Sequence, residues 1–211
     1  MSKYDDYLKN ALQHLFDHWM DGEVGLVAAA LVDSGNSIYA TSVLNADGTW
    51  KHAERNALEQ FKAAYGEPGQ SAVMLSTLSP CIRTAGSGDS YGDQKNAARR
   101  QEESCSDLLK QHGITTIGFG TLDNEDANGN DSYGNLGFKV LDIRDRTVVA
   151  VCKALNDMFP AYIEAEARGE IGCVALKAQL FGSSLCPKTM FERGENHTAS
   201  IDDRRRIESR S

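Results

Sequence analysis

Apolar residues recur along the first part of the chain with two different periods. Over Tyr4–Met20 they return every three or four positions, which predicts an amphipathic helix that Gly22 ends. The run Val24–Val32 is almost continuously apolar, which is typical of a strand covered on both faces. Residues 33–36 are turn-forming, so we expect Ser37–Leu44 to be the second strand of a hairpin.

Helical and strand patterns alternate in the next part of the chain. Residues 45–51 are expected to form a loop, and the stretch 52–65 that follows has an apolar stripe at helical spacing. A polar, Gly-rich insertion over residues 84–96 is expected to form a wall or lid of a pocket. The other elements expected here are a strand over 71–78, a helix over 105–113, a strand over 114–120, a loop over 124–134 and a fifth strand over 138–143.

The pattern becomes helical again beyond Arg146 and stays so to about Leu180, and from about Lys188 the chain is polar and charged. We therefore expect a first domain over 1–145, a helical extension packed on it over 146–187, and a mobile tail over 188–211. Strands alternating with helices predict an α/β fold.

The charge balance changes which partners are expected. The formal net charge is −8, and proteins that neutralise many phosphates usually present a basic face, so long nucleic acid is disfavoured as a partner. The sequence has no apolar run of about 18 residues and no signal-peptide pattern at its start, which argues against a membrane location. Five cysteines without a disulfide spacing favour a reducing compartment, so we expect a cytoplasmic protein.

Four residues carry the chemistry that the sequence suggests. His52, Cys81 and Cys105 offer one imidazole and two thiolates, and three such ligands on Zn²⁺ leave a fourth tetrahedral position open. Zinc lowers the pKa of a bound water to about 7, which supplies hydroxide at neutral pH. Glu54 follows His52 by two positions and is a candidate to move protons beside the metal.

A purely structural reading of these residues is the alternative. A histidine at a helix start is often a cap or a surface residue, and a lone cysteine is often a small buried apolar group. A structural zinc site would need four protein ligands, and no fourth Cys or His lies close by in the sequence. Cys152, Cys173 and Cys186 fall in the later helical region, and we expect them to be reduced core residues.

The order His52-Ala-Glu54, Pro80-Cys81 and Cys105 resembles the signature of the cytidine deaminase-like zinc deaminases. Most of that family has Pro-Cys-x-x-Cys, whereas here 23 residues (82–104) separate the two cysteines. Riboflavin-pathway pyrimidine deaminases also widen this gap and often read Thr-Leu-x-Pro-Cys, as residues 77–81 do here. The resemblance covers about residues 24–145. It implies a three-layer α/β/α sandwich with a mixed sheet of about five strands, here with a C-terminal helical extension, and it implies a homodimer or homotetramer.

The same resemblance implies a reaction. Zinc-bound hydroxide would attack a cytosine-like or other aminopyrimidine nucleoside or nucleotide, and Glu54 would pass protons to the ring and to the departing ammonia. Two other functions stay open. One is a deaminase of nucleic acid, such as an RNA editor or a toxin, which would need a basic groove. The other is a non-catalytic partner with the same fold, for which loss of Glu54 would be the mark.

Further residues are candidates for binding, each with a plain structural alternative. Asn45 precedes the His52 helix, where family members commonly place an Asn that holds the sugar or base; otherwise it is a turn residue. Arg55 is expected to restrain the charge of a ligand thiolate, or it is an exposed helix arginine. The basic residues of the insertion are candidates to bind a phosphate, or they are solvated: Arg83, Lys95, Arg99 and Arg100.

Overall fold

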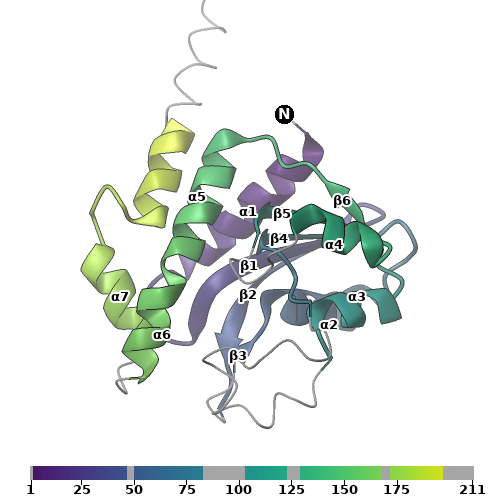
Figure 1. Cartoon of the computed structure of the whole chain (residues 1–211), viewed down its shortest axis with the longest axis horizontal. Coiled ribbons are helices and arrows are strands. Elements are labelled where there is room, and N and C mark those ends of the chain that lie inside the picture. Colours follow the sequence, from purple (N-terminus) through teal and green to yellow (C-terminus); the bar gives the residue numbers. More distant parts are fainter. Residues whose placement is uncertain (1, 47–49, 83–102, 123–128, 168–171, 197–211) are drawn as a thin grey trace, which may run out of the picture.

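A six-stranded mixed sheet forms the centre of the computed structural model, which describes residues 2–46, 50–82, 103–122, 129–167 and 172–196 (Figure 1). The order of the strands across the sheet is β3-β2-β1-β4-β5-β6. Their bounds are β1 Val24–Asp33, β2 Asn36–Leu44, β3 Trp50–Lys51, β4 Val73–Leu78, β5 Thr116–Thr121 and β6 Lys139–Leu141.

Strand direction decides which loops meet. β1 pairs antiparallel with both β2 and β4, and β5 is parallel to β4. The backbone N–H of Ala28 also donates to Thr77 Oγ1 at 3.1 Å, which ties β1 to β4 beyond the last ladder pair. The strands β2, β4 and β5 therefore all end at the same edge of the sheet, and the segments after Leu44, Leu78 and Thr121 emerge together. Open α/β sheets place their ligand sites at such an edge.

Helices cover both faces of the sheet. α1 and α5 pack on one face through a shared core, and α2, α3 and α4 pack on the other (Figure 1). The three-layer α/β/α sandwich with a mixed sheet and C-terminal helices is confirmed. The helices are α1 Lys3–Asp17, α2 Ala53–Tyr65, α3 Cys105–Gln111, α4 Gly129–Asn135, α5 Arg146–Asp157, α6 Phe159–Ala167 and α7 Gly172–Leu180.

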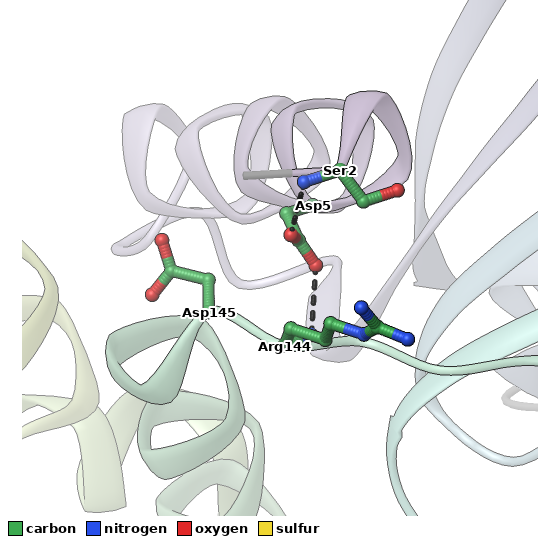
Figure 2. A pocket seen from close by; sticks show the side chains of 4 residues that line it. All are labelled: Ser2, Asp5, Arg144 and Asp145. Atoms are coloured by element: carbon green, nitrogen blue, oxygen red, sulfur yellow. Dashed lines mark hydrogen bonds between the residues drawn. The ribbon is translucent and has the colours of Figure 1, made fainter.

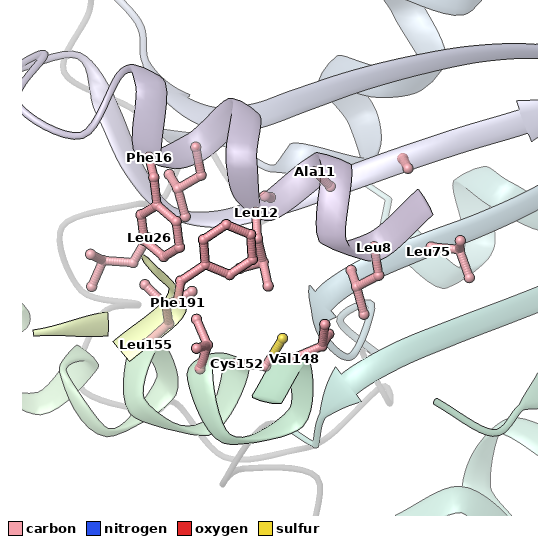
Figure 3. Close-up of a cluster of buried hydrophobic side chains, with 14 of the residues drawn as sticks. Leu8, Ala11, Leu12, Phe16, Leu26, Leu75, Val148, Cys152, Leu155 and Phe191 are labelled. Carbon is pink, nitrogen blue, oxygen red and sulfur yellow. The ribbon is translucent and has the colours of Figure 1, made fainter. Parts of the chain in front are cut away.

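Strand β1 supplies both cores because successive side chains of a strand point to opposite faces. Ala28 and Ala30 face the core shared with α1 and α5, whereas Ala29 and Leu31 face the core shared with α2 and α3. Figure 3 shows the first of these cores, in which side chains of α1, β1, β4 and α5 meet Phe191. The unbroken apolar run of β1 in the sequence follows from this burial on both faces.

Two elements differ from the sequence-based expectations. Within the loop expected over 45–51, Trp50 and Lys51 form the short edge strand β3, which pairs with Leu44 and Val43, so the sheet has six strands and not five. The stretch 124–134 was expected to be a loop, yet it contains most of helix α4. Glycine and asparagine dominate α4 and mask its helical period, while the buried side chain of Tyr133 attaches the helix to the core.

The C-terminal helices pack on the first domain through apolar and polar contacts. Lys177 of α7 is fully buried, and its Nζ donates to the carbonyl of Val24 at 2.7 Å. Residues 187–196 are helical, and Phe191 among them is only 2% exposed, so this part of the expected tail packs against the core. The division at 145 and 187 stays a prediction, and residues 197–211 lie outside the described residues. Within the described segments, no helix is both long and apolar enough to span a membrane.

Gly120 of β5 marks the closest approach between the sheet and α5, because a Cβ at this position would collide with Cys152 Sγ. We expect Gly120→Ala to lower the free energy of unfolding by about 1–3 kcal/mol, as overpacking of a filled core does. Urea unfolding measures the change. In the matched control Gly134→Ala, the added Cβ meets nothing within 4 Å, so stability should stay equal or rise slightly. Equal stability of the two variants would contradict the expectation.

Candidate functional site

Three separate segments of the chain present the three metal-ligand candidates at the sheet edge where β2, β4 and β5 end. His52 is the N-cap residue of α2, with extended backbone, and its side chain does not cap that helix. Cys81 lies three residues after β4, and Cys105 is the first residue of α3, for which Ser104 is the N-cap. His52 thus occupies the N-cap position, but its imidazole makes no capping hydrogen bond and instead contacts Cys105.

The three side chains converge on one point. The ligand atoms of His52, Cys81 and Cys105 all lie within 4.8 Å of one another. His52 Nδ1 lies 3.3 Å from Cys105 Sγ, and the backbone N–H of Cys105 donates to Cys81 Sγ at 3.2 Å. Zn–S and Zn–N bond lengths place the donors of a tetrahedral zinc about 3.5–3.8 Å apart. The donor types and their spacing therefore fit zinc, as the sequence predicted.

Glu54 lies beside this cluster in the first turn of α2 and is only 3% exposed. Its Oε2 is 3.8 Å from Cys105 Sγ. Burial raises the pKa of the Glu54 carboxyl above its ordinary value, while the charge of His52 and a hydrogen bond from Ser76 act in the opposite direction. The carboxyl group is thus shielded from solvent and lies next to the metal-ligand candidates, as a role in proton transfer beside the metal requires.

The Cys81 and Cys105 thiols shift each other's pKa in opposite directions. A hydrogen bond from the Cys105 thiol holds the pKa of Cys81 well below its usual range, with further help from His52. The same contact with Cys81, together with burial, raises the pKa of Cys105 well above its usual range. A bound cation deprotonates coordinating thiols outright, so both sulfurs can serve as thiolate ligands. Cys152 and Cys186, in contrast, are buried free thiols of the core, as predicted, and the side chain of Cys173 lies outside the described residues.

Arg55 points to the chain segment that carries Cys105. Its Nη2 donates to the carbonyl of Glu103 at 3.3 Å and lies 4.0 Å from that residue's Oε1. The positive charge of Arg55 also lowers the pKa of Cys105, although less than the other contacts raise it. Arg55 is thus a partly buried residue of the site, and its influence on the metal stays a prediction.

The substrate-contact candidates are only partly described by the structure. Asn45 follows β2 and is half-buried, at the sheet edge where the ligand cluster lies. Arg83, Lys95 and Arg99 lie outside the described residues, as do Arg100 and the expected lid over 84–96. Asn45 therefore has a suitable position, while a binding role for any of these residues stays a prediction.

Two residues that the sequence did not single out contact the Cys81 segment. Tyr133 of α4 donates from its hydroxyl to the carbonyl of Pro80 at 2.7 Å, and Ser106 of α3 donates to the same oxygen at 3.5 Å. Tyr133 comes from a stretch expected to be a loop, so no pattern in the sequence placed its hydroxyl near Pro80. A residue 53 positions away reaches the site only through the packing of α4.

An open hollow of about 440 Å³ lies elsewhere, between the starts of α1 and α5 (Figure 2). Its lining residues are Ser2, Asp5, Arg144 and Asp145. Asp5 accepts from the backbone N–H groups of Ser2 and Arg144 at 2.8 and 2.9 Å, and Asp145 is the N-cap of α5. These carboxylates are therefore engaged in holding helix ends, and none of the hollow's lining residues belongs to the His52, Cys81 and Cys105 cluster.

A protein-family comparison matches more than half of the chain. The family described as the cytidine and deoxycytidylate deaminase zinc-binding region matches residues 1–121. This range includes His52, Glu54, Cys81 and Cys105. A comparison with curated proteins found no match.

Solved structures share the fold at low sequence identity. The chain is similar to a diaminohydroxyphosphoribosylaminopyrimidine deaminase/5-amino-6-(5-phosphoribosylamino)uracil reductase from Thermotoga maritima, with 23% identity, a TM-score of 0.52, and 77% of this chain and 42% of that chain covered. It is similar to RibD from Acinetobacter baumannii, with 17% identity, a TM-score of 0.50, and 76% and 41% covered. A dCMP deaminase from the cyanophage S-TIM5, in complex with dCMP and dUMP, has 22% identity, a TM-score of 0.42, and 64% and 93% covered. The chain thus spans less than half the length of the first two proteins.

Asn56 anchors the helix that carries His52 and Glu54, because its Nδ2 donates to the carbonyl of Thr41 in β2 at 3.0 Å. We expect Asn56→Ala to lower the free energy of unfolding by about 1 kcal/mol, the usual value of such a hydrogen bond. Glu59→Gln on the same helix is the control. It removes only the charge of an exposed ion pair with Lys51, and such pairs contribute little. Chemical denaturation compares the two variants, and a larger loss in Glu59→Gln would contradict this account.

Proposed function

Because this chain belongs to the family of the cytidine and deoxycytidylate deaminase zinc-binding region, we propose that it hydrolyses a cytosine-like or other aminopyrimidine nucleoside or nucleotide. It is a zinc-dependent deaminase by family, and the aminopyrimidine substrate is the proposal. The reaction forms a C–O bond at the amidine carbon, breaks the C–N bond to the exocyclic amine and releases ammonia.

The observation that carries this proposal is the convergence of four side chains from distant parts of the sequence. His52 Nδ1, Cys81 Sγ and Cys105 Sγ form a compact donor set, and the Glu54 carboxyl lies 3.8 Å from one of those sulfurs. A structural zinc site would need a fourth Cys or His. Among the described residues, the cluster of possible metal ligands contains three, so a coordination position for reacting groups is part of the proposal.

Each of the four residues has a proposed role. His52, Cys81 and Cys105 hold the zinc ion, which when bound supplies the Lewis acidity that makes water a nucleophile near neutral pH. Glu54 accepts a proton from the attacking water at its carboxylate and donates it to the ring nitrogen beside the amidine carbon. It then accepts the second proton from the new C–OH group and donates it to the amine, which leaves as ammonia as the C=O bond forms. Because Glu54 is buried, bulk water is kept from its carboxyl, and protons reach the substrate through this one group.

Substrate binding and assembly are proposed from residues around the centre. Asn45 at the end of β2 is proposed to hold the sugar or base, and Arg83, Lys95 and Arg99 of the insertion are proposed to bind a phosphate. Arg55 is proposed to withdraw charge from Cys105. We also propose a homodimer or homotetramer, which light scattering after gel filtration tests.

A panel of possible substrates tests the proposed function. The zinc-loaded protein is incubated with bases, nucleosides, nucleotides, phosphoribosylaminopyrimidines and single-stranded nucleic acid, and ammonia release is measured. Turnover of an aminopyrimidine nucleoside or nucleotide supports the proposal, and dependence on the phosphate supports a role for the insertion. Turnover of nucleic acid alone, which the net charge of −8 disfavours, would replace the proposed substrate class.

The role of Glu54 predicts a specific loss of turnover. We expect Glu54→Gln to keep zinc in a 1:1 ratio but to lower the rate of deamination about 10²–10⁴-fold, the usual contribution of a positioned acid–base group. Zinc content and ammonia release are measured on the same sample. The control Glu59→Gln, an exposed carboxyl of the same helix, should keep both. A fully active Glu54→Gln protein would exclude the proposed proton transfers.

The role of the thiols predicts which cysteines the metal depends on. Cys105→Ser should purify with little or no zinc, because it removes one of three proposed ligands. Cys152 is buried in the core that α1 and α5 share, so the variant Cys152→Ala should lose stability but retain zinc. Metal analysis by mass spectrometry decides. Zinc bound at full occupancy in Cys105→Ser would mean that this cluster is not the metal centre.

A further inference from the structure

The backbone around Cys81 is held on both sides of the residue. Before it, the carbonyl of Pro80 accepts hydrogen bonds from the Tyr133 hydroxyl at 2.7 Å and from the Ser106 hydroxyl at 3.5 Å. After it, the carbonyl of Cys81 accepts from the backbone N–H of Ser106 at 3.2 Å. Both peptide planes that flank the Cα of Cys81 therefore have fixed partners, and together they set the direction of its Cα–Cβ bond.

These contacts matter because no regular element holds Cys81. Residues 79–82 belong to no helix or strand, although the N–H of Ser79 still donates to the carbonyl of Thr121 at 2.9 Å. Proline has no N–H, so Pro80 cannot itself donate a hydrogen bond that would fix the segment. The hydrogen bonds at the Pro80 and Cys81 carbonyls thus replace the ladder that ended with β4.

The Tyr133 side chain has little freedom to turn away from Pro80. It is fully buried, and its ring packs against Phe119 and Phe138 with centroid distances of 5.3 and 6.4 Å. Phe119 belongs to β5, which pairs with β4, so the ring rests on the same sheet from which the Cys81 segment emerges. The hydroxyl is therefore aimed at Pro80 by rigid neighbours on both sides.

We propose that Tyr133 is a positioning residue of the metal centre. Its hydroxyl holds the Pro80–Cys81 peptide in the orientation that directs the Cys81 thiolate toward the metal. Ser106 is the weaker second donor to the same carbonyl. This inference rests on the proposed zinc site. Helix α4 supplies no proposed metal ligand, and it influences the geometry of the metal centre through the Tyr133 hydroxyl group.

Tyr133→Phe tests the proposal because it keeps the ring and removes only the hydroxyl. Zinc affinity is measured by competition with a chromophoric chelator, and the visible spectrum of the Co²⁺-substituted protein reports the geometry at the metal. We expect a loss of about 10–100-fold in zinc affinity, the usual effect of removing a hydrogen bond that orients a ligand. We also expect a shifted or weakened Co²⁺ spectrum.

Two further variants separate positioning from general stability. In Tyr39→Phe, the control, a tyrosine also loses a hydroxyl, which there accepts from Asn10 Nδ2 at 3.2 Å on the exposed surface. Its zinc affinity and Co²⁺ spectrum should equal those of the unaltered protein. Ser106→Ala removes the second donor to Pro80 and should lower zinc affinity less than Tyr133→Phe does. Thermal melting of the metal-free proteins shows whether each variant folds.

The outcomes divide clearly. Lower zinc affinity and an altered Co²⁺ spectrum in a folded Tyr133→Phe protein support the proposal, and if that variant does not fold, the same changes in Ser106→Ala support it. Unchanged affinity and spectrum in the folded variants overturn it, as does an equal loss in Tyr39→Phe. If the unaltered protein binds no zinc, the proposed function fails together with this inference, whereas the other outcomes leave the proposed function standing.

Discussion

The pairing of β1 with β2 and β4 is the constraint on which the rest of the structure depends. Because β1 runs antiparallel to both neighbours, β2 and β4 must run in the same direction, and β5 follows β4. Three strands therefore end at one edge of the sheet, and the chain leaves that edge at Asn45, at Ser79 and at Leu122. The candidate metal ligands lie at this edge because two of the connections that begin there lead to His52 and to Cys81. A strand in the other direction would place them at opposite ends of the molecule.

The burial of β1 on both faces fixes its position in the sheet. The alternate residues of β1 enter two separate cores, so a shift of β1 by one residue would exchange every side chain between them. The C-terminal helices complete the first of these cores through Cys152, Leu155 and Phe191 (Figure 3). The second core supports the helix that carries His52 and Glu54. Helices α1 and α5, together with the segment of Phe191, thus cover the face of the sheet opposite the helices that carry His52, Glu54 and Cys105.

Three polar side chains near the site donate hydrogen bonds to backbone carbonyls. Asn56 holds the carbonyl of Thr41, Arg55 holds that of Glu103, and Tyr133 holds that of Pro80. Each of these bonds restrains a backbone segment next to a metal-ligand candidate, and this fixes the relative positions of the donors. Such preorganisation lowers the entropy lost on binding. Asn56, Arg55 and Tyr133 thus act on the candidate site through the backbone that carries its donors.

Residue types and their order were enough to predict His52, Cys81 and Cys105 as metal-ligand candidates, because few kinds of side chain bind zinc. These residues and Glu54 each lie at or near the end of an element that the local sequence predicts. The period of the apolar residues was likewise enough for α1, β1, β2, α2, β4 and α5, since each buries one face or both. Tertiary structure alone decided that the three ligand atoms lie within 4.8 Å of one another. It alone showed the edge strand β3, which is only two residues long and pairs with β2. It alone brought Tyr133 to Pro80, because a glycine- and asparagine-rich helix has no apolar period to announce it, and a hydrogen bond across 53 positions leaves no trace in local sequence.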